Sequence, residues 1–146
     1  MKTILLVLLQ FVLFSAFAQN SIRITWDFKN IEPGFDHQNK IVVFIDKQPI
    51  AESETFLESQ IGTLNFRMPS SKFYKIRIVN YAWTDGEWEE HMISNKYSID
   101  CIYEKNVKLK TNKTGLLHLT FDFKFDKMKI KSKYIKTKKV RPKPEK

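Results

Sequence analysis

Carboxylates, aromatic rings and an imidazole are concentrated between residues 81 and 91, around an Asp-Gly dipeptide at 85–86. Asp-Gly between two alternating segments predicts a two-residue hairpin turn. Such a turn pairs the two tryptophans of the stretch with each other, and its tyrosine with a glutamate, across neighbouring strands. One face of the hairpin would then carry the candidate ligand-binding residues Tyr81, Trp83, Trp88 and Glu90. This face could stack a sugar ring or another flat ligand; alternatively, the aromatic pair only stabilises the hairpin.

The acids of the same stretch allow two further readings, a metal site or a pair of glycosidase carboxylates. Alternation along a strand sends Glu89 and Glu90 to opposite faces. His91 has no second histidine close by to complete a zinc site, and the spacing of an EF-hand is missing. We therefore predict no metal, no cofactor and no catalytic residue. A hydrolytic enzyme, carbohydrate-active or other, that uses acids of the Asp85 hairpin remains the alternative.

Two other reactive side chains have simpler interpretations. Cys101 is the only cysteine and shares the apolar side of its segment with Ile99 and Tyr103, which predicts a buried, inert thiol. His118 lies on the polar side of an alternating run, and no G-x-S-x-G motif supplies a nucleophile. We expect His118 to face solvent.

The elements that must position these residues are strands, because period-two alternation recurs along the chain and no helical period persists. Nine short strands are expected, with turn signals between them, at 21–28, 41–45, 50–55, 62–68, 72–81, 87 onward, 97–103, 117–125 and 128–134. This spacing predicts an all-β fold, a single small antiparallel β-sandwich over residues 19–134.

Residues 1–18 have the pattern of an export signal. A lysine near the start is followed by a mostly apolar run at 4–14, and Ala16 and Ala18 form a small-x-small cleavage site. The apolar run is too short for a membrane anchor, which needs about 20 residues. We predict cleavage after Ala18, a mature chain with no transmembrane segment, and a secreted or periplasmic location.

The formal net charge of +9 comes from the C-terminal end. Residues 127–146 hold ten Lys or Arg and one acid, whereas the remainder of the chain is balanced. Residues 135–146 are expected to form a basic, disordered tail. Its cations could contact an anionic envelope surface or glycan, and the candidates are Lys136, Lys138, Lys139, Arg141 and Lys143. The alternative is a solubilising tail; nucleic acid is the least expected partner, because no aromatic residues are interleaved to stack bases.

These features together predict a non-enzymatic binding or structural β-sandwich module of the bacterial envelope or extracellular space. They do not identify its ligand, because a sandwich fold by itself implies no activity.

Overall fold

Strand β1 (Gln19–Lys29) illustrates how the alternating sequence builds the core. Its even-numbered apolar residues, Ile22, Ile24, Trp26 and Phe28, are all buried, with at most 7% of their surface exposed. The odd-numbered residues between them face outward, because successive side chains of a strand point to opposite sides. One face of β1 therefore belongs to the core and the other to the surface.

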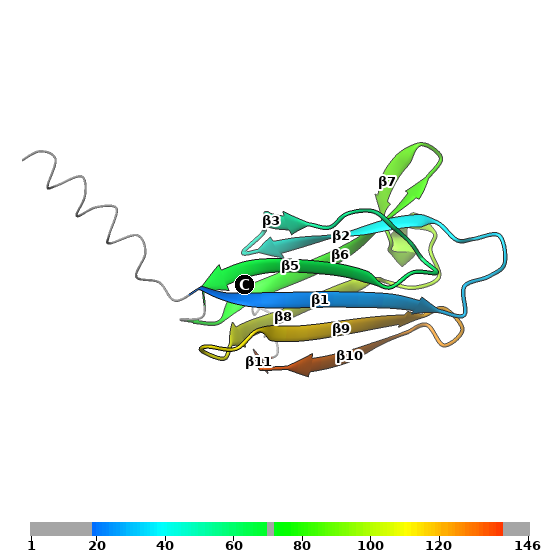
Figure 1. Cartoon of the computed structure of the whole chain (residues 1–146). Coiled ribbons are helices and arrows are strands. Elements are labelled where there is room, and N and C mark those ends of the chain that lie inside the picture. The colour runs from blue at the N-terminus through cyan, green and yellow to red at the C-terminus, as the bar shows by residue number, and fades with distance from the viewer. Residues whose placement is uncertain (1–18, 70–71, 139–146) are drawn as a thin grey trace, which may run out of the picture.

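The computed structural model describes residues 19–69 and 72–138, and it places β1 in a four-stranded sheet (Figure 1). The order of the strands is β10 (Lys127–Lys133), β9 (Gly115–Asp122), β1 and β5 (Gly62–Pro69). β1 runs parallel to β9, and every other pair in both sheets is antiparallel. The parallel pair is possible because β1 and β9 are far apart in the sequence and need no hairpin.

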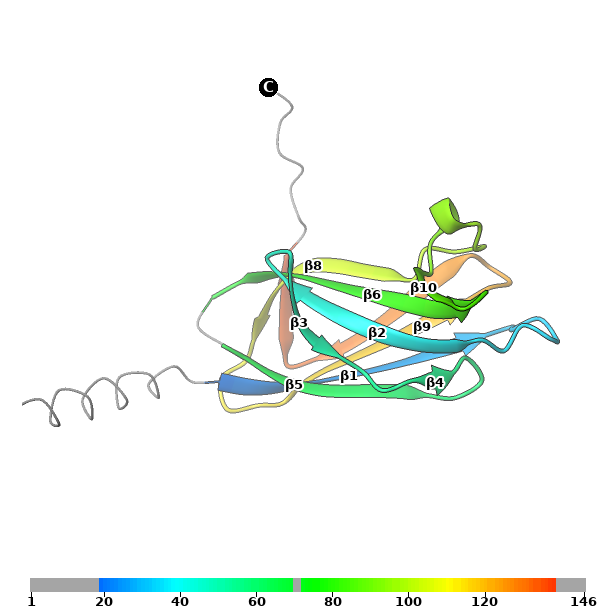
Figure 2. The same ribbon diagram turned by 90° about the horizontal axis from the view of Figure 1, so that it is seen from above.

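The second sheet has seven strands and faces the first (Figures 1 and 2). Along its main path lie β11 (Ile135–Lys138), β8 (Ile102–Leu109), β6 (Tyr74–Thr84), β2 (Gln38–Ile45) and β3 (Gln48–Glu52). Two short strands lie off this path: β4 (Phe56–Leu57) pairs with β2, and β7 (Glu87–Glu90) pairs with β6. A single 3₁₀ turn, η1 (Ile93–Asn95), follows β7.

The core fills the space between the sheets, which confirms the predicted β-sandwich. β9 contributes Leu117, Leu119 and Phe121 opposite Ile76, Ile78, Tyr103 and other buried residues of the second sheet. The described residues form eleven strands, two more than predicted, because the short β4 and the terminal β11 carry no clear alternation. Cys101 is fully buried in this core as a free thiol, as predicted.

Two of the predicted strands have boundaries that differ from those in the structure. The alternation at 97–103 is not a strand, since β8 starts at Ile102. Residues 97–101 instead close around His91, where the Cys101 N–H donates to the His91 carbonyl over 2.8 Å. β9 ends at Asp122, and Phe125, expected on its apolar face, lies in a turn with 57% of its surface exposed.

Of the boundaries predicted from the sequence, the one between residues 134 and 135 lies within the described part of the chain. The sheet continues past Tyr134 through β11, so the first four residues of the expected tail are a strand. Residues 1–18 and 139–146 lie outside the described part of the chain. Across residues 19–69 and 72–138, no helix is long and apolar enough to cross a membrane.

Candidate functional site

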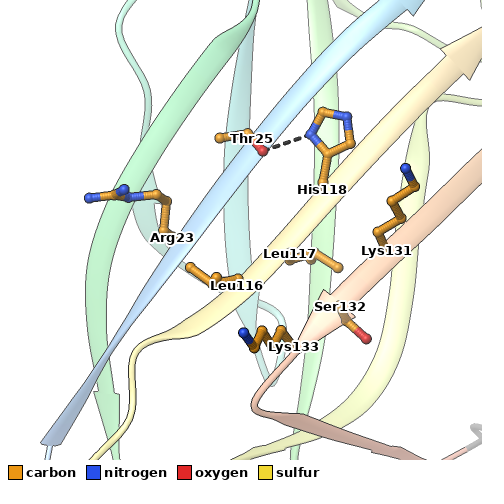
Figure 3. A pocket seen from close by; sticks show the side chains of 8 residues that line it. All are labelled: Arg23, Thr25, Leu116, Leu117, His118, Lys131, Ser132 and Lys133. Atoms are coloured by element: carbon orange, nitrogen blue, oxygen red, sulfur yellow. Dashed lines mark hydrogen bonds between the residues drawn. The ribbon is translucent and has the colours of Figure 1, made fainter.

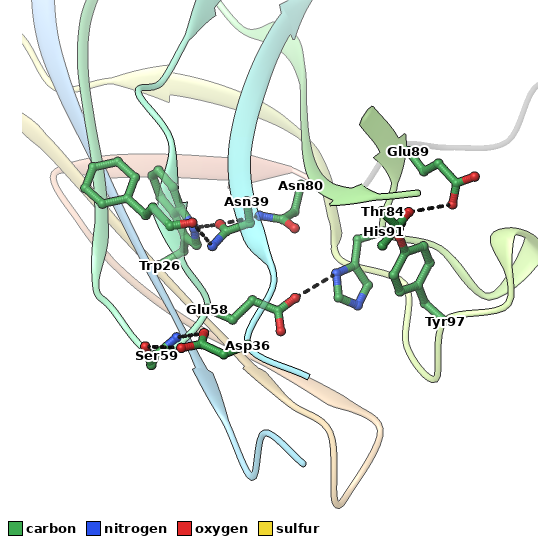
Figure 4. Close-up of polar contacts among 11 residues, drawn as sticks. Trp26, Asp36, Asn39, Glu58, Ser59, Asn80, Thr84, Glu89, His91 and Tyr97 are labelled. Carbon is green, nitrogen blue, oxygen red and sulfur yellow. Dashed lines mark hydrogen bonds and ion pairs between the residues drawn. The ribbon is translucent and has the colours of Figure 1, made fainter. Parts of the chain in front are cut away.

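A pocket of about 720 Å³ opens at one end of the sandwich. Four connections meet there: the loop after β1, the turn after β4, the segment after β7 and the turn after β9. Its volume is in the range of small-molecule sites, and such sites are typically concave and mostly apolar with a few polar groups. The two groups that distinguish this pocket are Glu58 and His91 (Figure 4).

Glu58 follows β4 directly and is held by its backbone. Its N–H donates to the His37 carbonyl over 3.0 Å. β4 is itself fixed by the side chain of Asn39, whose amide donates to the Phe56 carbonyl over 3.0 Å. The Asn39 oxygen accepts from the Trp26 indole N–H at 2.7 Å and from the Asn80 amide at 3.0 Å. This buried network fixes the segment that delivers Glu58 to the pocket (Figure 4).

His91 follows β7 directly and continues the pairing of the hairpin. Its N–H donates to the Asn80 carbonyl over 2.9 Å, and its carbonyl accepts the Cys101 N–H. The ring packs between three aromatic side chains: the ring centroids of Tyr97, Phe123 and Phe28 lie 4.2, 5.5 and 5.8 Å away. Both backbone and ring are therefore fixed, which gives the imidazole one orientation.

Glu58 and His91 approach each other without forming a hydrogen bond. Their side chains are 2% and 3% exposed, and 3.6 Å separates Glu58 Oε1 from His91 Nδ1. That distance is too long for a hydrogen bond. Neither atom has another hydrogen-bond partner among the described residues. The two atoms face each other with almost no accessible surface, whereas both residues line the pocket with the rest of their side chains.

Burial also changes the protonation of both groups. Loss of solvent raises the pKa of Glu58 to about 8, from an ordinary value of 4.5. Loss of solvent lowers the pKa of His91 to about 4, from 6.5, and the nearby His37 adds to the effect. At pH 7 the carboxyl is therefore protonated and the imidazole neutral. The pair presents an O–H and a ring nitrogen with no net charge, and perturbed groups of this kind are typical of functional sites.

The remaining lining of the pocket combines aromatic rings with polar and charged side chains, and Glu32 is its exposed acid. Phe35, Tyr97 and Phe123 contribute rings, and Phe35 is 56% exposed. Lys96 and Lys124 are exposed at the rim. A ligand bound here would meet aromatic rings, the buried Glu58–His91 pair and exposed charges of both signs.

The hairpin residues predicted from the sequence come together on one face, away from this pocket. Trp83 pairs with Trp88 and Tyr81 with Glu90, in the expected register. The turn residues Asp85 and Gly86 both have positive φ, as a type I′ turn requires. The indoles meet edge to face at 5.2 Å.

The outer face of the hairpin is already occupied by protein contacts. Lys40 Nζ lies 4.5 Å from the centre of a Trp88 ring. The Tyr81 hydroxyl donates to Glu90 over 3.1 Å, and Glu90 also pairs with Arg77 at 3.4 Å. Only Trp83 keeps a substantially open ring, with 39% of its surface exposed. These contacts favour stabilisation of the hairpin over a stacking platform.

The other predicted residues are dispersed. Glu89 and Glu90 point to opposite sides of the hairpin, so no pair of carboxylates converges in a desolvated site there. No three His, Cys, Asp or Glu side chains converge anywhere in residues 19–69 and 72–138. Lys136 and Lys138 lie on β11, exposed, with Lys136 opposite Lys108 of β8. Lys139, Arg141 and Lys143 lie outside the described residues.

The pocket pair was not singled out by the sequence, although one signal pointed to it. The hairpin register assigns His91 to the face of Ile78 and Ala82, both of which are buried. A histidine on an apolar face has to be buried, and a buried imidazole needs a partner. Glu58 gave no such signal. It follows a strand of only two residues, and this strand has polar residues on both sides in the sequence.

In the comparison with known proteins, the sequence matches no protein family and no curated protein. The molecule is a β-sandwich with a pocket at one end, and a buried Glu–His pair is part of the pocket's lining.

Proposed function

We propose that this chain is an exported, non-enzymatic binding module that holds a small ligand in the end pocket. The ligand class is a flat apolar body with an uncharged polar tip, such as a carbonyl or amide. The observation that carries the proposal is the end pocket, whose lining includes aromatic rings and the buried Glu58–His91 pair. A ligand's carbonyl or amide could form a hydrogen bond with the part of Glu58 or His91 that lines the pocket.

The absence of charge on the pair selects against an ionised tip. A buried charge without a partner costs far more than a buried neutral dipole. The aromatic walls contribute apolar contact to any ring, whatever its substituent. Three probes with the same ring therefore separate the contribution of the ring from that of the charge at the tip. Benzamide has a neutral tip, benzoate an anionic one and benzylamine a cationic one.

The test is titration calorimetry of the processed protein with these three probes at pH 7. Benzamide should bind most tightly, and Ser98→Trp, which places a large ring at an exposed position of the pocket wall, should abolish its binding. Ser94→Trp adds the same ring on η1, outside the pocket, and should bind as the wild type does. Binding that survives Ser98→Trp, or tighter binding of either charged probe, would contradict the proposal.

Export forms part of the proposal and has its own support. It rests on the signal pattern at 1–18: a lysine near the start, an apolar run and a small-x-small cleavage site. Expression in a bacterial host with mass spectrometry of the periplasmic and culture fractions would test it. The expected product begins at Gln19; a full-length product retained in the cytoplasm would refute export.

A further inference from the structure

A second depression, of about 380 Å³, lies on the outer face of the four-stranded sheet, away from the end pocket (Figure 3). Three cations line it, Arg23, Lys131 and Lys133, and no acidic residue does. Leu116 and His118 lie among them.

The strand register produces this arrangement. Arg23 pairs with Leu116 and Leu116 with Lys133, so the three form one row across β1, β9 and β10. Thr25, His118 and Lys131 form the next row in the same way. Neighbouring strands are about 4.8 Å apart, so the backbones that carry Arg23 and Lys133 are about 10 Å apart, with an apolar side chain between them.

The positive charge at this end of the face is not neutralised by the protein. None of the three cations forms an ion pair with another described residue. The acids of the face, Asp27 and Asp122, are displaced along the strands, and Asp122 pairs in register with both Lys29 and Lys127. The other end of the face holds Lys29, Lys127 and Lys129 together with these two acids, so the net positive charge is greatest at the Arg23 end.

The centre of the depression combines an apolar side chain with fixed polar groups. Leu116 is 37% exposed. The His118 ring is oriented by Thr25, whose hydroxyl lies 2.7 Å from Nδ1, and by Asp27, 3.3 Å from Nε2. A Thr–His–Asp group of this kind could suggest a nucleophile. However, β1 and β9 are hydrogen-bonded to strands on both sides, so their backbone N–H groups are not available as an oxyanion hole. The Thr25, His118 and Asp27 side chains are therefore better suited to binding a ligand than to nucleophilic catalysis.

We propose that this depression binds one acidic sugar residue of an anionic polysaccharide. The sugar's C–H face would rest on Leu116, and its acid group would lie between Arg23, Lys131 and Lys133. A membrane surface is less suitable, because a flat anionic layer would not enter the depression to contact Leu116. The site is independent of the end pocket, and its ligand differs in charge from the one proposed there.

The test is calorimetry of the processed protein with a galacturonic acid hexamer, and with an uncharged glucose hexamer as the reference glycan. The variant K131Q/K133Q removes two cations from the depression. The control K47Q/K108Q removes two cations from the opposite sheet, one between β2 and β3 and one on β8, and so matches the change in net charge. The side chains of all four lysines reach solvent, and thermal unfolding checks that both double variants are as stable as the wild type.

The acidic hexamer should bind, the neutral one should not, and K131Q/K133Q should weaken binding by about tenfold, the combined effect of two surface ion pairs. The control should change it by less than twofold, and binding should weaken with added salt. Equal loss in both double variants would mean attraction by net charge alone and would overturn the site. Anionic phosphatidylglycerol vesicles and inorganic sulfate serve as further probes. Binding of either in a manner sensitive to K131Q/K133Q, without binding of the hexamer, would also refute the glycan.

Discussion

Replacing Glu58 by glutamine should stabilise the protein, and the gain should grow with pH. The folded chain holds the proton of Glu58 up to a pKa of about 8, whereas the unfolded chain releases it near 4.5. Between these values the folded state binds more protons, so stability decreases as pH rises. A pH of 7 is about 2.5 units above the ordinary pKa of 4.5. Because each unit corresponds to about 1.4 kcal/mol, burial of Glu58 lowers the stability of the folded state at pH 7 by about 3 kcal/mol. Glutamine keeps the shape and carries no titrating proton, so this cost is removed.

The assay is urea unfolding of both proteins at intervals from pH 4.5 to 8. The free energy of unfolding of E58Q minus that of the wild type should increase steadily across this range and reach its limit near pH 8. Glu54→Gln makes the same chemical change at an exposed position between β3 and β4 and should alter stability by less than about 0.5 kcal/mol at every pH. A constant difference between E58Q and wild type would refute a buried, protonated Glu58.

The same variant isolates the behaviour of His91. The folded pKa of about 4 lies below the ordinary 6.5, so the unfolded chain binds more protons between these values and stability falls as pH is lowered. In the wild type the opposite slope of Glu58 largely offsets this loss. In E58Q the decline from pH 6.5 to 4 should become visible, by about 3 kcal/mol. If the free energy of unfolding of E58Q does not change between pH 6.5 and 4, His91 is solvated in the folded state.

Three further outcomes follow from the packing. Gly62→Ala should lower the free energy of unfolding in urea by about 3 kcal/mol, because a Cβ at this position would lie 2.1 Å from the Trp26 ring. The control Thr63→Ala changes an exposed neighbour and should cost less than about 0.5 kcal/mol. Equal effects of the two substitutions would refute the close approach of Gly62 to Trp26. Cys101 should be inert to a thiol reagent such as dithiobis-nitrobenzoate until the protein unfolds, because burial raises the pKa of this thiol well above its usual value; fast reaction in buffer would contradict its burial. Trp83→Ala should cost about 1 kcal/mol at most by thermal unfolding and leave benzamide affinity unchanged; a loss of affinity would move the binding site to the hairpin.

The parts of the fold that follow from local sequence were predictable. Two-residue alternation identified the core face of β1, and the Asp-Gly turn fixed the pairing of Trp83 with Trp88, because a type I′ turn admits one register. Local pattern did not reveal that β1 and β9 are parallel neighbours. That pairing joins residues more than 90 positions apart, and no turn chemistry records it.

The candidate site was less predictable for the same reason. Glu58 and His91 are 33 positions apart and meet only because Asn39 fixes β4 and residues 97–101 close over the hairpin end. The tendency of alternating residues to form a strand was overridden at Tyr97, whose ring packs on His91 instead. The basic depression depends on the register of three strands, so its lysines could be recognised in the sequence as a charged row but not as a site.

A crystal structure of the processed protein grown with benzamide tests the end pocket most directly. The ring should lie against Tyr97 and Phe123, with the amide within hydrogen-bonding distance of Glu58 or His91. Benzamide bound at Trp83 or elsewhere on the surface, with the pocket unoccupied at saturating concentration, would contradict the binding function proposed for this sandwich.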